Sequence, residues 1–121
     1  MGVQSAPPDQ LCMIHVVAEL TIAPGARGPF LDAFRRLEPL VRAEDGCLEY
    51  GGVIEVQTAL AAQAAPRPDV LLVIEKWANE GALAAHLAAP HMAEFAAQTS
   101  GQMTGRVIRV ARDVSGPHAV R

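Results

Sequence analysis

Four side chains near the middle of the sequence are of types that hold or move protons around an aromatic ligand. Glu75 and Trp77 are two residues apart in an apolar run typical of a strand, so both point to one face. His86 shares a helical stripe with Leu83, and Tyr50 lies in an earlier strand-like run. These four side chains could line one cavity between a sheet and its helices. The alternative is that the three rings are core residues and that Glu75 forms a structural ion pair.

The other histidines, the cysteines and the glycines fit no common cofactor motif. His86 and His91 are five residues apart with Pro90 between them, whereas helical metal ligands are usually four apart, so we predict no metal site. His91 is better explained as a helix-start residue that could reach a pocket mouth. Cys12 and Cys47 fit no zinc spacing and are expected to be small buried residues. The sequence lacks a glycine-rich nucleotide motif, so neither a flavin nor a nicotinamide cofactor is predicted.

The composition is typical of one small globular domain. The chain has 121 residues, of which 50% are hydrophobic and 4% aromatic, and its net charge is −3. An acidic chain with few rings is a poor match for nucleic-acid binding. No apolar run approaches the ~18 residues of a membrane helix. Residues 1–10 lack the pattern of a secretory signal, so we expect a cytoplasmic location.

Alternation and helical spacing predict the first two elements. Along residues 11–22 every second side chain is apolar, which indicates a strand with one face in the core. His15 lies on the other face. A helix should begin at Gly28-Pro29, because proline suits the first helical position. It should kink or end near residue 38, because Pro39 removes a hydrogen bond. The expected core faces consist of Ile14, Val16, Ala18, Leu20 and Ile22 in the strand, and Phe30, Phe34, Leu37 and Val41 in the helix.

A second strand and a long connection should follow. Gly46 closes the helix in a left-handed conformation. Gly51-Gly52 weakens the strand and indicates a bulge or a close approach of backbone. The strand spans 47–56, with Leu48, Tyr50, Val53 and Val56 turned inward. Residues 57–68 are read as a long hairpin connection that could include a helical turn.

The last part of the chain should hold two strands and two short helices. Residues 69–77 are the third strand, and Asn79 is a good cap for the helix after it. Pro90 interrupts this helix, and a second one carries Phe95. After a loop at 101–105, residues 106–113 form the fourth strand.

This order of elements is β-α-β-β-α-β, the ferredoxin-like arrangement of the α+β class, with helices on one face of a four-stranded antiparallel sheet. The domain is predicted over 13–113, between a disordered extension at 1–12 and a tail at 114–121. The third strand is apolar on both faces, unlike a strand with one face in water. A second copy of the chain would cover the free face, so a homodimer is expected.

One family of small proteins shares the pattern of these residues. Glu44-Asp-Gly-Cys-Leu-Glu-Tyr50 is followed by Glu75-Lys-Trp77 and a helix with Glu80, Leu83 and His86. Together with Met13–Gly25 and Pro90-His91, they resemble the antibiotic biosynthesis monooxygenases, dimeric α+β barrel proteins that include quinol monooxygenases. The resemblance covers about residues 13–113. The 57–68 connection is longer than is usual in that family.

The resemblance implies a cofactor-independent monooxygenase that oxidises a quinol-like or polycyclic phenolic substrate with dioxygen. In that chemistry His86 would be the general base, Trp77 would stack on the substrate, and Tyr50 would bind its oxygen. Glu75 would orient a partner. Further pocket residues would be Leu83, His91 and Phe95. Haem-degrading relatives use an asparagine on the first strand, where this chain has Ala18, so haem degradation is not expected.

Two other functions fit the same pattern. The fold could serve as a non-catalytic dimer that binds a small molecule or acts in a stress response. It could also be an isomerase acting on a small phosphorylated, sugar-like ligand. An isomerase of that kind needs cations at its pocket, and the candidates are Arg106, Arg109 and Arg112 on the last strand.

Overall fold

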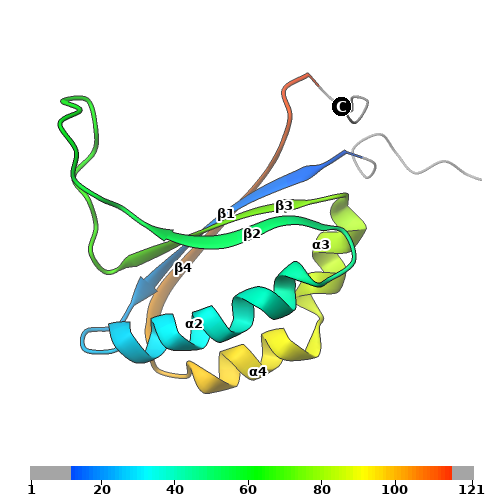
Figure 1. Ribbon diagram of the computed structural model, residues 1–121, viewed down its shortest axis with the longest axis horizontal. Coiled ribbons are helices and arrows are strands. Elements are labelled where there is room, and N and C mark those ends of the chain that lie inside the picture. Colours follow the sequence, from blue (N-terminus) through cyan, green and yellow to red (C-terminus); the bar gives the residue numbers. More distant parts are fainter. Residues whose placement is uncertain (1–11, 116–121) are drawn as a thin grey trace, which may run out of the picture.

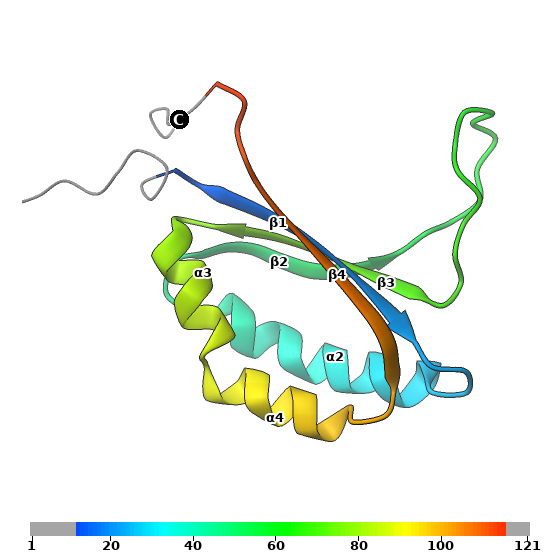
Figure 2. The same cartoon turned by 180° about the vertical axis from the view of Figure 1, so that it is seen from behind.

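The computed structural model describes residues 12–115 as one antiparallel sheet with helices on one of its faces (Figures 1 and 2). The sheet order is β2-β3-β1-β4, so β1 and β3 are central. This arrangement confirms the predicted ferredoxin-like α+β fold. The predicted extension and tail lie almost wholly outside the described residues. The elements are β1 (Ile14–Ile22), α2 (Arg27–Arg42), β2 (Cys47–Ile54), β3 (Val70–Trp77), α3 (Glu80–Leu87), α4 (Pro90–Gln98) and β4 (Met103–Arg112).

Helix α2 continues through Pro39, so the helix does not end near residue 38, which was one of the two outcomes predicted for this proline. Proline removes one backbone hydrogen bond but keeps a helical φ. Val41 lies on the same apolar stripe as Phe34 and Leu37, and all three are buried in the core. Burying a valine of this kind contributes about 1.5–3 kcal/mol, which offsets the missing bond. The helix ends instead at Arg42, and the amide of Ala43 still donates to the Pro39 carbonyl at 3.2 Å.

Strand β2 is an edge strand, and only part of its predicted inner face is buried. Tyr50 is buried as expected, whereas Leu48 is 57% exposed and Val53 and Val56 are exposed too. The pairing with β3 shifts between Cys47 and Glu49, which breaks the simple alternation that the prediction assumed. Val56 lies beyond the end of the strand.

The glycine pair in β2 marks a close approach, as predicted. A Cβ atom at Gly52 would lie 2.6 Å from a ring carbon of Phe34 on α2. Helix α2 can therefore sit against this part of the sheet only because residue 52 has no side chain. The bulge lies earlier in β2, at the Cys47/Glu49 shift.

The fourth strand begins earlier than predicted and takes in most of the expected 101–105 loop. Met103 already pairs with Ile22, across an irregularity in the β1–β4 ladder. Pro90 separates α3 from α4, as expected, and stands at the first position of α4. Residues 55–69 contain turns and bends but no helix.

The two faces of the sheet differ in what covers them. Alternate residues of β1 and β3 face the helices and form the core, including the whole predicted inner face of β1. The opposite face carries Val17, Val53 and Val107, which are exposed. In Figures 1 and 2 all the helices lie on one side, and the β2–β3 connection projects beyond the sheet on the other side. Within residues 12–115, no helix is long and apolar enough to cross a membrane.

Candidate active site

A cavity of about 130 Å³ lies between the covered face of the sheet and the helices. Its wall is mostly apolar, with a few polar groups. Cavities of roughly 150 Å³ are known to hold benzene, so this space suits one aromatic ring. The lining residues are Ala18, Leu20, Phe34, Tyr50, Val73, Glu75, His86, Leu87, Met92, Phe95, Ala96, Thr99, Met103, Arg106 and Ile108.

His86 is the imidazole of this cavity, and its helix is firmly positioned. Asn79 caps α3 by accepting a hydrogen bond from the Ala82 amide at 2.8 Å. The His86 side chain is 2% exposed, and its ring centroid lies 4.6 Å from that of Trp77 and 5.6 Å from that of Tyr50. Packing on two sides fixes the ring plane, which a proton-transfer group requires.

Glu44 determines which nitrogen of His86 is available to a ligand. The Glu44 Oε2 atom lies 3.0 Å from His86 Nδ1, so a neutral ring donates from Nδ1 and leaves Nε2 unprotonated. Nε2 has no hydrogen-bond partner among residues 12–115. A carboxylate behind an imidazole also stabilises the imidazolium that forms on proton uptake. The pair therefore has the geometry of a general base and the residue that orients it.

Glu75 and Trp77 form a second pair, with Trp77 behind the wall. The Trp77 Nε1–H donates to Glu75 Oε1 at 2.9 Å. Burial raises the pKa of the Glu75 carboxyl, and the hydrogen bond from Trp77 opposes that rise. Trp77 is fully buried and is not among the lining residues. Its contacts are therefore with Glu75 and His86, which it holds in place, rather than with the cavity.

Tyr50 supplies a hydroxyl donor on the sheet side. Its ring stacks on Phe34 at 5.8 Å, and its hydroxyl has no hydrogen-bond partner within residues 12–115. Burial raises the pKa of Tyr50 far above its usual range, with the charge of Glu75 adding to the effect. The phenol therefore stays protonated and can donate to a bound oxyanion.

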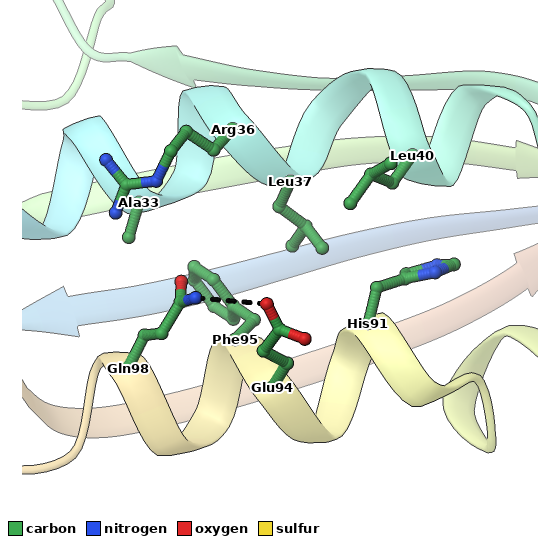
Figure 3. A pocket seen from close by; sticks show the side chains of 8 residues that line it. All are labelled: Ala33, Arg36, Leu37, Leu40, His91, Glu94, Phe95 and Gln98. Carbon is green, nitrogen blue, oxygen red and sulfur yellow. Dashed lines mark hydrogen bonds between the residues drawn. The ribbon is translucent and has the colours of Figure 1, made fainter.

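Three other predicted pocket residues lie in different places. Phe95 lines the cavity from α4. Leu83 packs against the core but lines a separate surface hollow beside Ile14 and Val110. His91 lies outside the cavity, at the end of a groove between α2 and α4 (Figure 3). Its Nε2 is 2.5 Å from Glu44 Oε2.

Glu44 is the residue of the site that the pattern of the sequence did not predict. It lies in the turn after α2, where no periodicity predicts a direction for its side chain. Gly46 makes this turn possible, with φ of +79°, and a Cβ atom there would lie 2.6 Å from the Cβ of Ala82. The Gly46 carbonyl also accepts from the Ala78 amide at 2.8 Å. The turn is thereby held against the start of α3, close to His86.

The arginines required for a phosphorylated ligand do not gather here. Arg106 lines the cavity, whereas Arg109 pairs with Val17 and therefore faces the opposite side of the sheet. Arg112 lines the hollow beside Leu83. Of the three candidates, one remains at the cavity.

Comparisons with known proteins agree with one another. The model of the antibiotic biosynthesis monooxygenase family matches residues 13–98. YgiN of Escherichia coli K12, named a probable quinol monooxygenase, is 32% identical over 100 residues, which cover 81% of this chain and 95% of that protein. A Caulobacter crescentus crystal structure described by the same family name has 28% identity and a TM-score of 0.73, covering 87% of this chain and 92% of that one. A conserved protein from Methanosarcina mazei has 25% identity and a TM-score of 0.71, with 86% and 95% covered.

Proposed function

Because the chain belongs to the antibiotic biosynthesis monooxygenase family, we propose that it oxidises a quinol-like substrate with dioxygen and without a bound cofactor. The observation that carries this proposal is the convergence of His86, Glu75 and Tyr50 on one small apolar cavity. The volume supports a single-ring quinol over a polycyclic phenol. A three-ring flavin and a substrate would not fit there together.

The proposed reaction needs little from the protein beyond proton control. His86 Nε2 takes the proton of a quinol hydroxyl, and Glu44 stabilises the resulting imidazolium through Nδ1–H. The Tyr50 hydroxyl donates to the quinolate oxygen. The electron-rich ring then reduces dioxygen. One oxygen atom enters the ring, the other leaves as water, and the product is a hydroxyquinone.

The apolar wall and the buried pair behind it support the same assignment. A dry cavity strengthens each hydrogen bond to the developing anion and excludes competing reactions with water. Trp77 is a positioning residue, because its N–H holds Glu75 and its ring supports His86. Phe34 and Phe95 provide flat contacts for the substrate ring.

We also propose that the chain acts as a homodimer. The bare face of the sheet exposes Val17, Val53 and Val107 in one layer, which a second copy could cover by two-fold pairing. The cavity lies on the other side of the sheet, so each protomer would carry its own site.

Oxygen uptake by chelator-treated protein tests the proposed reaction. We expect single-ring quinols to support uptake of one dioxygen per quinol, and ¹⁸O₂ to leave one labelled atom in the product. Polycyclic anthrones should react more slowly. Release of one hydrogen peroxide per dioxygen would contradict a monooxygenase, as would the absence of uptake across the whole panel.

The alternatives receive less support from the site. A binding protein without turnover would be favoured by a wholly apolar cavity and a His86 bonded to backbone, whereas the cavity has polar groups and His86 is bonded to Glu44. An isomerase for a phosphorylated ligand would need several cations, and only Arg106 of the candidates is available.

A further inference from the structure

We infer that Glu44, His86 and His91 form a binding site for a zinc-like divalent transition metal. One carboxylate oxygen and two imidazole nitrogens converge there, with all three atoms within 4.8 Å of one another. Glu44 Oε2 lies 3.0 Å from His86 Nδ1 and 2.5 Å from His91 Nε2. Two imidazoles and one carboxylate are a known zinc ligand set that leaves a fourth position open.

The break between α3 and α4 brings these ligands together and explains why their spacing did not predict a site. His86 lies in the last turn of α3, and His91 lies in the first turn of α4, after Pro90. The usual spacing of four assumes one continuous helix. Here the chain turns between the two histidines, so both rings reach Glu44 in the turn after α2. The prediction that there is no metal site rested on that spacing.

The donor atoms favour a borderline transition metal over calcium or magnesium. Calcium and magnesium prefer oxygen ligands, and this cluster offers two nitrogens. In the absence of metal, Glu44 Oε2 accepts a hydrogen bond from each ring. A metal would replace those two protons. Tetrahedral ligands at about 2.0 Å are about 3.3 Å apart, so each histidine nitrogen would move away from Glu44 Oε2 by less than about 1 Å. The two nitrogens, which lie within 4.8 Å of each other, would move together by up to about 1.5 Å.

Two of the three ligands are anchored in a way that suits a metal site. The Glu44 amide donates to the Val41 carbonyl at 2.9 Å, and the Glu44 carbonyl accepts from the Cys47 amide at 3.1 Å. The ring of His86 packs on Trp77. These contacts fix two ligands before any ion arrives, which lowers the entropic cost of binding.

His91 provides a route from solvent to this cluster. Its side chain is 23% exposed, compared with 13% for Glu44 and 2% for His86. Figure 3 shows it at one end of the groove between α2 and α4, extending from α4 towards Leu40. This groove has a volume of about 110 Å³ and also contains Glu94 and Phe95. An ion could therefore enter past His91, and the open position would face the groove.

Metal binding would change what the cavity presents to a substrate. An imidazole that coordinates through Nδ1 carries its proton on Nε2. His86 would then offer a donor to the cavity in place of an acceptor. If the proposed function holds, the metal would inhibit the enzyme, but metal binding itself does not depend on that function.

Titration of untagged, chelator-treated protein with Zn²⁺ by calorimetry, and with Co²⁺ by visible absorption, tests the site. We expect one ion per chain and at least about tenfold weaker binding in Glu44→Gln and in His91→Ala. His15→Ala is the matched control, because His15 pairs with Asp113 at 2.9 Å on the opposite face of the sheet. It should bind like wild type, and so should Cys47→Ser. No binding up to about 1 mM, or wild-type affinity in both ligand variants, would overturn the proposal.

Nuclear magnetic resonance of the His86 ring gives a second, independent readout. Without metal, the ring proton should be on Nδ1. Saturation with Zn²⁺ should move it to Nε2, with a coordination shift at Nδ1. A zinc-saturated protein that keeps the proton on Nδ1 would contradict coordination by His86. Circular dichroism should show that Glu44→Gln and His91→Ala are folded, because neither residue belongs to the apolar core.

Discussion

The two faces of the sheet each hold a histidine–carboxylate pair, and the pairs differ in depth. On the covered face, His86 lies 3.0 Å from Glu44 and is 2% exposed. On the open face, His15 lies 2.9 Å from Asp113, and both side chains are about one-third exposed. Water screens the outer pair, so its effect on a proton is small. The inner pair adjoins a cavity and two rings. Burial beside a cavity, rather than pairing alone, is what makes a histidine a candidate for catalysis.

Replacing His86 or His15 with alanine should give the largest difference in activity between changes on the covered face and changes on the open face. His86→Ala takes away the proposed base, so kcat/KM for a quinol should fall by about 10²–10⁴-fold. His15→Ala should change it by less than about twofold. Oxygen-electrode kinetics on the two variants, both checked for folding, measure this contrast. Equal activity in the two variants would mean that depth does not distinguish the pairs.

A charge on the open face should break the proposed dimer and leave the covered face intact. Val17→Asp would bury an unpaired carboxylate between the two copies, at a cost of about 3 kcal/mol or more. The dimer dissociation constant should rise at least about 100-fold in sedimentation velocity. Ser100→Asp, on an exposed turn at the helix side, is the control and should remain dimeric. A Val17→Asp protein that stays dimeric would place the interface elsewhere.

Gly51 and Gly52 of β2 point to opposite faces of the sheet, so replacing each with alanine compares how tightly the two faces are packed at this point. Gly52→Ala would push a methyl group to 2.6 Å from Phe34, so the free energy of unfolding should fall by about 1–3 kcal/mol. Gly51→Ala would meet only the ends of the Arg42 and Glu38 side chains, at 3.4 and 3.8 Å. Its effect should stay within about 0.5 kcal/mol. Urea unfolding measures both, and equal losses would show that the approach of α2 is not tight.

Glu75→Gln should have a smaller effect on stability than Gly52→Ala, and that effect should depend on pH. Burial raises the folded-state pKa of Glu75 above its unfolded value. The folded chain therefore holds this proton more tightly, and the associated stability is lost as pH rises through the folded pKa. The Gln variant lacks that loss. It should be more stable than wild type at neutral pH, where Glu75 is charged in the unfolded chain, and the difference should shrink as the pH falls to the ordinary range of a glutamate. A difference that grows on acidification would reverse the assignment.

Regular periodicity explains which parts of the molecule the sequence could predict. The period of two in β1 and β3 gave the core face of β1 and placed Glu75 on the inner side. Helical spacing turned His86 towards the sheet. The predicted helix end near Pro39 is wrong because local propensity does not include the tertiary burial of Val41. The predicted inward direction of Leu48 is wrong because an edge strand with a shifted register does not keep its alternation.

The rest of the site depends on contacts between elements that are distant in sequence. Trp77 lies on the same face of β3 as Glu75, but at the end of the strand. There its Nε1–H is bonded to Glu75 and its ring packs against His86. Glu44 lies in a turn, and its contacts with His86 and His91 depend on where α3 ends and α4 begins. No local sequence pattern predicts such contacts.

A crystal structure of the chain with a single-ring quinol bound under anaerobic conditions would show where the substrate binds. We expect the ring in the cavity between the sheet and the helices, with one hydroxyl within hydrogen-bond distance of His86 Nε2. The Tyr50 hydroxyl should contact the same oxygen atom or the one across the ring. A quinol found on the open face, or in the groove between α2 and α4 with the cavity empty, would contradict this expectation.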